Sequence, residues 1–203
     1  MLLLGFLGTN FLMAFRVASV PVFTVSKTTS TFPDPVYTSG LSDRTFFDTA
    51  YDKAVADPFE APLDVHAIVS PHHLLVADRI AALFSSVASK RVKTVIVLSP
   101  NHFSRGRTPV LLSRGSWNTP YGIVSSDLQA IDELAEDVVV DETPFSEEHG
   151  IGSLTPFIAR SFPNAKIIPV VIDETTLGSD KVALLIQRLA LSRSPRRISH
   201  CIR

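Results

Sequence analysis

Two histidines follow apolar segments of the chain at matching positions, and imidazole nitrogens are common ligands of transition-metal ions. His72 follows residues 67–70, which read Ala-Ile-Val-Ser, and His102 follows residues 95–98, which read Val-Ile-Val-Leu. Each segment has the length and the β-branched composition of a buried strand. The residue types therefore predict two strands that each end in a histidine loop.

The segment between these strands predicts how they are arranged. Residues 74–90 carry apolar side chains at helical spacing, so the order strand, helix, strand is expected. Such a crossover makes the two strands parallel neighbours, and open α/β sheets place ligands at the carboxyl ends of their strands. We therefore expect His72 and His102 to bind one transition-metal ion, and these ligand types leave iron, copper and zinc open.

A second group with chemical potential is Glu147-Glu148-His149, at the start of a helix predicted over residues 146–162. Carboxylates are stabilised by the positive end of a helix, so helix capping alone would explain the two glutamates. Alternatively, Glu148 orients or binds the metal, and His149 binds it, transfers protons or hydrogen-bonds a substrate. Spacing leaves both readings open, and Glu148 and His149 are the candidate catalytic residues.

Three further residues are candidates for a substrate pocket. His73 directly follows the first candidate ligand, and Trp117 and Tyr121 belong to residues 116–122, where a turn is expected. Core packing is an equal alternative for the two aromatic residues. His66 is interpreted as structural.

Composition excludes several classes of protein. The chain of 203 residues has a formal net charge of −1 and a pI near 6.6, so no large basic surface for nucleic acid is indicated. Cys201 is the sole cysteine, which excludes a disulfide framework and a cysteine-based zinc site. The length suits one ordinary domain with additional segments.

Residues 1–25 are mostly apolar, with Arg16 as their charged residue, and they predict an export signal or a membrane anchor. The basic region that begins a standard signal peptide is missing, and a spanning helix would bury Arg16 at a cost of a few kcal/mol. A buried strand or helix, or a start codon misplaced within a longer anchor, are the alternatives. Without membrane attachment, a cytoplasmic location is expected.

Composition also divides the rest of the chain. Residues 26–45 are rich in Ser, Thr and Pro and are interpreted as a linker, residues 46–191 as one α/β domain, and residues 192–203 as an atypical basic tail. Helices are predicted over 45–56, 74–90, 126–135, 146–162 and 177–191, and strands over 67–70, 95–98, 109–113, 138–140 and 166–172. This alternation predicts a central, mostly parallel sheet flanked by helices.

Several motifs in this domain resemble the Memo family, also called the protein B component of the AmmeMemoRadiSam system. They are Ser70-Pro71-His72-His73-Leu74-Leu75, Ser99-Pro100-Asn101-His102 with Gly106, Trp117-Asn118-Thr119-Pro120-Tyr121-Gly122, Glu148-His149-Gly150-Ile151, Leu154-Thr155-Pro156-Phe157 and Ile168-Pro169-Val170. The motifs occur in the family's order over residues 67–172. Many members have His-Ala-Gly-Tyr where this chain has His-His-Leu-Leu, so a different pocket wall is expected there.

The resemblance also implies a metal and its ligands. The Memo family is similar in fold to the class III extradiol dioxygenases, which hold non-haem iron with histidines and a carboxylate. His72 and His102 would then be the first two ligands, with His149 in or beside the pocket. Iron or copper is therefore the expected ion, and zinc is the alternative.

One part of the family pattern has no counterpart in this sequence. The family's remaining ligand is a histidine in a Ser-x-Asp-x-x-His segment that follows a further strand, whereas the chain ends in Ser199-His200-Cys201-Ile202-Arg203. Codons that encode these residues can, when the reading frame is shifted by one base, encode Leu-Ile-Ala-Ser. That sequence resembles the strand that precedes the missing motif in the family. We therefore expect a truncated or frameshifted member that binds metal weakly or has lost it.

Three functions follow from these observations. The first is a metal-dependent oxidoreductase similar to the dioxygenases, the second a non-catalytic binding or scaffold domain, and the third a metal-assisted hydrolase. Each would use the histidine pocket at the carboxyl edge of the sheet for a small molecule or a peptide. None of them involves nucleic acid.

Overall fold

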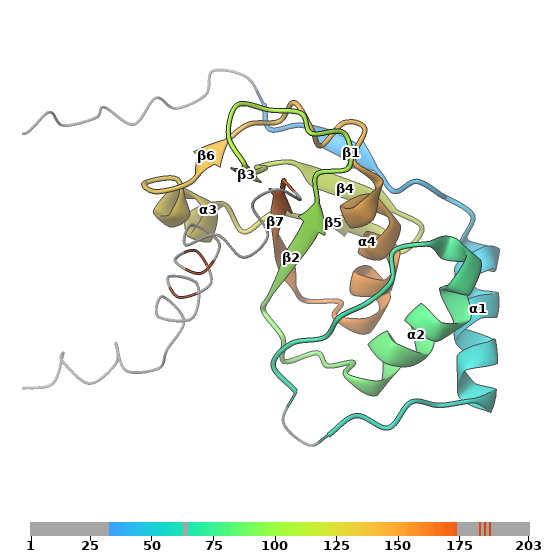
Figure 1. Cartoon of the computed structure of the whole chain (residues 1–203). Helices are drawn as coiled ribbons and strands as arrows, with labels where there is room; N and C mark the ends of the chain where they lie inside the picture. The colour runs from blue at the N-terminus through green and yellow to red at the C-terminus, as the bar shows by residue number, and fades with distance from the viewer. Residues whose placement is uncertain (1–32, 63–64, 174–182, 184, 186, 188–203) are drawn as a thin grey trace, which may run out of the picture. The chain divides into compact units, whose positions relative to one another are not determined.

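The computed structural model describes residues 33–62 and 65–173, together with residues 183, 185 and 187. Helices and strands are interspersed along this part of the chain, and helices flank two sheets (Figure 1), which confirms the α/β class. In chain order the elements are β1 (Val36–Thr38), α1 (Arg44–Ala56), the 3-10 helix η1 (Leu74–Val76), α2 (Ala77–Ser86), β2 (Thr94–Pro100), β3 (Val110–Leu112), β4 (Ser116–Thr119), β5 (Gly122–Val124), α3 (Leu128–Leu134), β6 (Val139–Val140), α4 (His149–Ser161) and β7 (Lys166–Ile172).

The larger sheet has four strands in the order β2-β7-β3-β6. β2 and β7 are parallel, as are β3 and β6, whereas β7 and β3 are antiparallel. Along β7, Ile167 and Val171 are buried in one apolar cluster, and Ile168, Val170 and Ile172 in another. Because successive side chains point to opposite faces of a strand, β7 is covered on both sides, as its continuous apolar sequence predicts.

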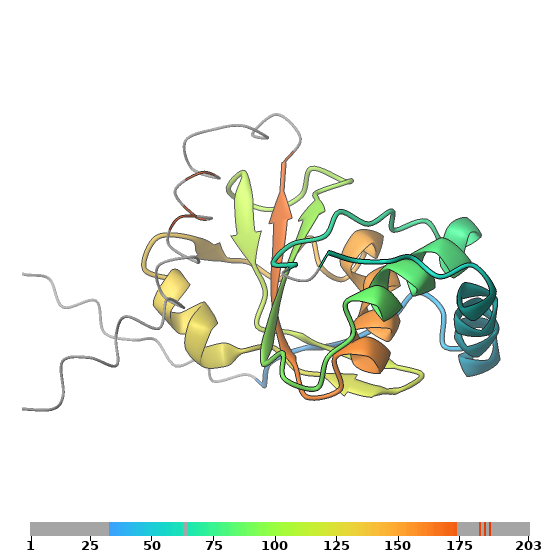
Figure 2. The ribbon, with the colours of Figure 1, turned by 90° about the horizontal axis from the view of Figure 1, so that it is seen from below.

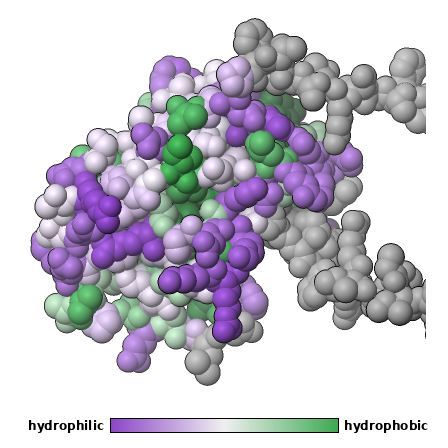
Figure 3. Space-filling model, turned by 180° about the vertical axis from the view of Figure 1, so that it is seen from behind, coloured by the Kyte–Doolittle hydropathy of each residue, from purple (hydrophilic) through white to green (hydrophobic). Residues whose placement is uncertain are grey.

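Helices cover the two faces of this sheet unequally. α3 lies on one side, and α4 lies on the other with α1 and α2 beyond it, as both ribbon views show (Figures 1 and 2). The larger apolar cluster fills the space among α1, α2, α4 and the sheet, and the smaller one lies on the α3 side. The face seen in Figure 3 is mostly polar, with apolar residues in small separate groups.

α1 shows why the outer helices pack where they do. Asp43 caps it, because the Asp43 side chain accepts a hydrogen bond of 2.9 Å from the backbone nitrogen of Thr45. Its buried residues are Phe47, Ala50, Tyr51 and Ala54. This spacing of three and four residues forms one apolar face, which packs against α2 and α4.

A second sheet, of three strands in the order β1-β4-β5, was not predicted. Residues 116–122 were expected to form a turn, but they form most of the antiparallel hairpin of β4 and β5, with Trp117 opposite Val124. Only Pro120 and Tyr121 connect the two strands. The strands are too short to show a periodic pattern, and β1, which pairs with β4 in parallel, lies far away in the sequence.

The strand predicted over residues 67–70 is wrong. These residues have no regular structure, and Val69 is 97% exposed. In the described part of the chain β2 pairs with β7 and not with this segment, so the predicted pair of neighbouring histidine strands is absent. An apolar, β-branched sequence indicates only that the residues prefer an extended backbone. A strand also needs a neighbouring strand that pairs with its backbone hydrogen-bonding groups.

Three predicted segments lie outside the described residues: the apolar residues 1–25, most of the helix at 177–191 and the tail at 192–203. Among the helices that the structure does describe, none has the length and apolar character needed to cross a membrane.

Trp117 provides a test of the second sheet. Its side chain is 1% exposed and packs against Tyr37 and Phe145, so Trp117→Ala should lower the free energy of unfolding by about 3–5 kcal/mol. The matched control is Ile123→Ala in the same hairpin, because Ile123 is 63% exposed and should change this free energy by less than about 0.5 kcal/mol. Urea denaturation measures both, and similar losses would contradict the buried position of Trp117.

Candidate metal centre

Three histidine rings converge at the end of the larger sheet. His72 lies in the segment before η1, His102 follows β2, and His149 is the first residue of α4. The ring centroid of His72 lies 4.8 Å from that of His102 and 5.3 Å from that of His149. The ring centroids of His102 and His149 are 4.2 Å apart. One ligand atom of each ring lies within 4.8 Å of the other two. His72 and His102 thus come together without the neighbouring strands that were expected to bring them there.

Glu148 orients His102. One Glu148 oxygen accepts a hydrogen bond of 3.0 Å from the His102 backbone nitrogen, and the other lies 2.6 Å from His102 Nδ1. The Glu148 side chain is 1% exposed. Because an ionised carboxylate can only accept hydrogen bonds, it assigns the ring proton to Nδ1 and leaves the Nε2 lone pair of His102 free for a ligand.

Glu148 also begins α4. Its oxygen nearer to the ring accepts a hydrogen bond of 2.8 Å from the Gly150 backbone nitrogen, so the carboxylate is the N-cap of this helix. The two readings of Glu148, helix cap and histidine partner, are therefore both present in the structure. His149 follows directly and is exposed, with its ring in the cluster.

The loop after β2 is held by Asn101. Its backbone nitrogen donates to the Ile172 oxygen at 2.8 Å, and its buried side chain bonds to both backbone groups of Arg105, donating to the oxygen at 2.6 Å and accepting from the nitrogen at 3.2 Å. Arg105 in turn pairs with Glu147 at 2.7 Å. His102 therefore leaves β2 in a loop that is fixed on both sides.

Gly150 permits the close approach of α4 to β2. A Cβ atom at this position would lie 2.1 Å from Ser99 Oγ, which is closer than real atoms come. Sequence reasoning did not assign a role to Asn101, Ser99 or Gly150. Their position next to the candidate ligands could have indicated a role, since Asn101 directly precedes His102 and Gly150 directly follows His149.

The pKa of His72 is lowered from its ordinary value. Partial burial is the first cause, and the neighbouring rings of His102, His149 and His73 add to it, whereas Glu148 opposes it. The neutral ring is the form that can donate a lone pair to a metal ion. The surroundings of His72 therefore favour its ligand form.

The donor atoms lie too far apart to share one ion as they stand. Two nitrogens that each lie about 2.1 Å from a tetrahedral metal ion are about 3.4 Å apart, so a separation of up to 4.8 Å must shrink by as much as about 1.4 Å. His102 and the start of α4 are tied together by Glu148. Within the described residues no hydrogen bond holds the ring of His72 or of His149, so movement of these two side chains can close the site.

The three candidates for a substrate pocket lie in different places. His73 stacks beside His72, with ring centroids 6.0 Å apart, at the edge of the cluster. Trp117 lies in the core, the alternative that the sequence left open.

Tyr121 lies at the opposite end of α4 from the cluster. Its hydroxyl donates to Asp48 Oδ1 at 2.7 Å and accepts from Arg160 Nη1 at 2.9 Å. His149 is the first residue of α4 and Arg160 belongs to its last turn, so about 16 Å of helix separate them. The structure therefore does not bring Tyr121 or Trp117 to the histidines.

Comparison with known proteins identifies relatives of this chain. The family described as "Memo-like protein" matches residues 45–191. A MEMO1 family protein of Nitrosopumilus maritimus is 29% identical over 137 residues, which are 64% of this chain and 50% of that protein. A MEMO1 family protein of Sulfolobus acidocaldarius is 39% identical over 84 residues, 39% of this chain and 29% of that protein. The chain thus spans about half, or less, of the length of the relatives that it matches.

The contact between Gly150 and Ser99 can be tested by adding one methyl group. Gly150→Ala should lower the free energy of unfolding by about 1–3 kcal/mol, because Ser99 Oγ must leave its position and Ser99 Cβ, 3.3 Å from the added carbon, must give way. Gly40→Ala is the control, since a Cβ atom at Gly40 would have nothing within 4 Å. If urea denaturation gives both variants the same stability, the tight contact between Gly150 and the Ser99 side chain is contradicted.

Proposed function

The chain belongs to the Memo-like protein family, and from this premise we propose that it binds a transition-metal ion through His72, His102 and His149. The observation that carries the proposal is the convergence of three imidazole donors at one sheet edge. Neutral imidazole suits iron, copper, zinc and nickel, whereas magnesium and calcium prefer oxygen ligands. The two Glu148 oxygens are already engaged with His102 and Gly150, which supports a site of nitrogen donors.

The proposed reaction class is oxidation of a small substrate with iron or copper. Such an ion would supply redox chemistry, whereas zinc would supply Lewis-acid chemistry toward water or a carbonyl group. Three protein ligands leave coordination positions for a substrate. The exposure of His149 supports access from solvent.

The chain's own residues have separate proposed roles. Glu148 holds His102 in one tautomer and makes its free nitrogen a stronger donor. His149 is the third donor and, when it is not bound to the ion, a group that can accept a proton from a substrate. His73 and Phe103 would form the wall of the substrate site, since the Phe103 ring lies 6.2 Å from the His149 ring and the His73 ring 6.0 Å from that of His72.

Anaerobic reconstitution with iron, copper or zinc, followed by metal analysis and an oxygen-consumption assay, tests the proposed class. Stoichiometric iron or copper with oxygen uptake supports an oxidoreductase. Tight metal without oxygen uptake points to a hydrolase, and a folded chain that binds no metal is a binding domain. Either of the last two results would contradict the proposed redox function.

Replacing a proposed ligand should weaken metal binding strongly. His72→Ala, His102→Ala and His149→Ala should each lower the affinity for Zn²⁺ or Co²⁺ by at least about 10- to 100-fold, because each removes one donor of three. His73→Ala is the matched control and should retain the affinity, since His73 adjoins the cluster without belonging to it. Calorimetric titration measures the affinities, and unchanged binding in all three variants would refute the proposed site.

The orienting role of Glu148 predicts a smaller but measurable effect. Glu148→Gln should lower metal affinity by about 10- to 100-fold, because an amide cannot serve as acceptor to all three of the donors that the carboxylate satisfies. Glu147→Gln is the control, since Glu147 is half-exposed and pairs with Arg105 on the surface. Equal affinities of the two variants would show that Glu148 only begins the helix.

A further inference from the structure

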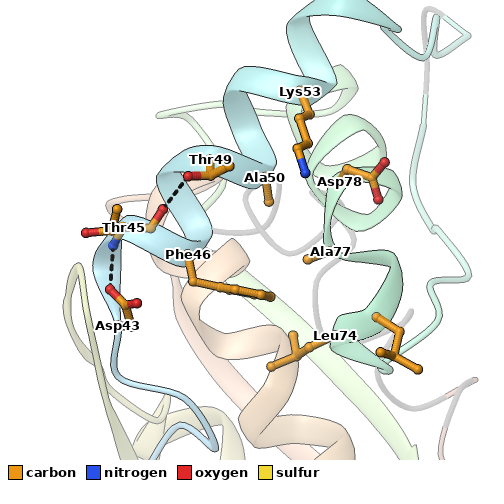
Figure 4. A pocket seen from close by; sticks show the side chains of 10 residues that line it. Asp43, Thr45, Phe46, Thr49, Ala50, Lys53, Leu74, Ala77 and Asp78 are labelled. Carbon is orange, nitrogen blue, oxygen red and sulfur yellow. Dashed lines mark hydrogen bonds between the residues drawn. The ribbon is translucent and has the colours of Figure 1, made fainter.

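A pocket of about 490 Å³ lies between α1 and the segment that forms η1 and α2 (Figure 4). This volume is within the range of small-molecule sites, about 300–1,000 Å³. None of the three clustered histidines lines it, although Leu74, one of its lining residues, lies two residues after His72. It is therefore a separate candidate for ligand binding, independent of the metal site.

One end of the pocket carries two opposite charges that are not paired with each other. Lys53 reaches this end from α1 and Asp78 from α2 (Figure 4). Neither side chain has an ion-pair or hydrogen-bond partner among the described residues. The third charge at the pocket, Asp43, is engaged, because its carboxylate accepts the hydrogen bond from the Thr45 backbone that caps α1.

The other part of the pocket is apolar. Phe46 and Leu74 face each other across it (Figure 4), and Leu75 also lines it. Leu75 is 90% exposed, so its side chain is open to contact with a ligand. Between the two ends the buried residues Ala50 and Ala77 form a floor with small side chains, so the space above them remains open.

We propose that this pocket binds a free α-amino acid with a large apolar side chain, of which leucine is the simplest example. The ligand carboxylate bonds to the Lys53 ammonium, and the ligand ammonium bonds to the Asp78 carboxylate. The apolar side chain covers Phe46, Leu74 and Leu75.

Charge complementarity selects this class of ligand over its relatives. A ligand with only a carboxylate would leave Asp78 without a partner, and a ligand with only an amine would leave Lys53 without one. A zwitterion satisfies both charges and, like the Lys53–Asp78 pair, has no net charge. Glycine has both charges but no side chain to cover the apolar part of the pocket.

NMR titration of the full chain with leucine tests the proposal. A dissociation constant on the order of 1 mM is expected for a small ligand in an open pocket. Glycine, 4-methylpentanoate and 3-methylbutylamine each lack one recognised group and should bind at least about tenfold more weakly. If 4-methylpentanoate or 3-methylbutylamine binds as well as leucine, or if leucine does not bind, the proposal is overturned.

Two pairs of variants locate the ligand. Lys53→Met and Asp78→Asn should each weaken leucine binding by about tenfold, the factor that corresponds to about 1.4 kcal/mol. Lys90→Met and Asp52→Asn are the controls, because both residues are exposed and do not line the pocket. Unchanged binding to both pocket variants places leucine elsewhere and refutes the site.

His102→Ala separates this proposal from the metal site. The variant should keep its affinity for leucine, because His102 does not line the pocket. Loss of leucine binding in this variant, with its spectrum otherwise unchanged, would contradict an independent site.

Discussion

The buried carboxylate of Glu148 joins the carboxyl end of β2 to the N-terminus of α4. It accepts hydrogen bonds from the backbone and the ring of His102 and from the backbone of Gly150. Hydrogen bonds to a charged acceptor are stronger than neutral ones, and each buried donor left without a partner would cost about 1–3 kcal/mol. The positive end of α4 stabilises the same charge. The positions of His102 and His149 therefore depend on one side chain, which also sets the tautomer of His102.

The third histidine reaches the cluster in a different way. His72 lies in a segment without regular structure, next to an edge strand that leaves it unpaired. The cluster thus combines one ring held by Glu148, that of His102, with the rings of His72 and His149, which make no hydrogen bond among the described residues, so these two rings can bring the donor atoms together most easily. The lowered pKa of His72, caused first by its partial burial, keeps that ring in the form that binds metal.

Helix α4 is the element that both the candidate metal centre and the outer helices depend on. Its first residue is His149, and its buried side chains Ile151, Phe157 and Ile158 belong to the cluster that also contains residues of α1 and α2. The match to the Memo-like family spans residues 45–191, so it includes these three helices and all three histidines. The pocket between α1 and α2 is lined by side chains of these two outer helices and by Leu74 and Leu75, which follow the histidine loop.

Sequence alone determined the elements whose signal is local. The continuous apolar residues of β2 and β7 and the helical spacing in α1 and α4 predicted those elements at nearly their observed bounds, and the histidine motifs indicated the family and the residues of the cluster. Only the tertiary structure decided which segments pair as strands. Residues 67–70 form no strand, whereas residues 116–124 form a hairpin in which the Trp117 side chain is buried in the core. Tyr121 likewise meets Arg160 at the far end of α4. Strand pairing and burial depend on partners that are distant in the chain, and a local pattern of residue types carries no information about which partner is present.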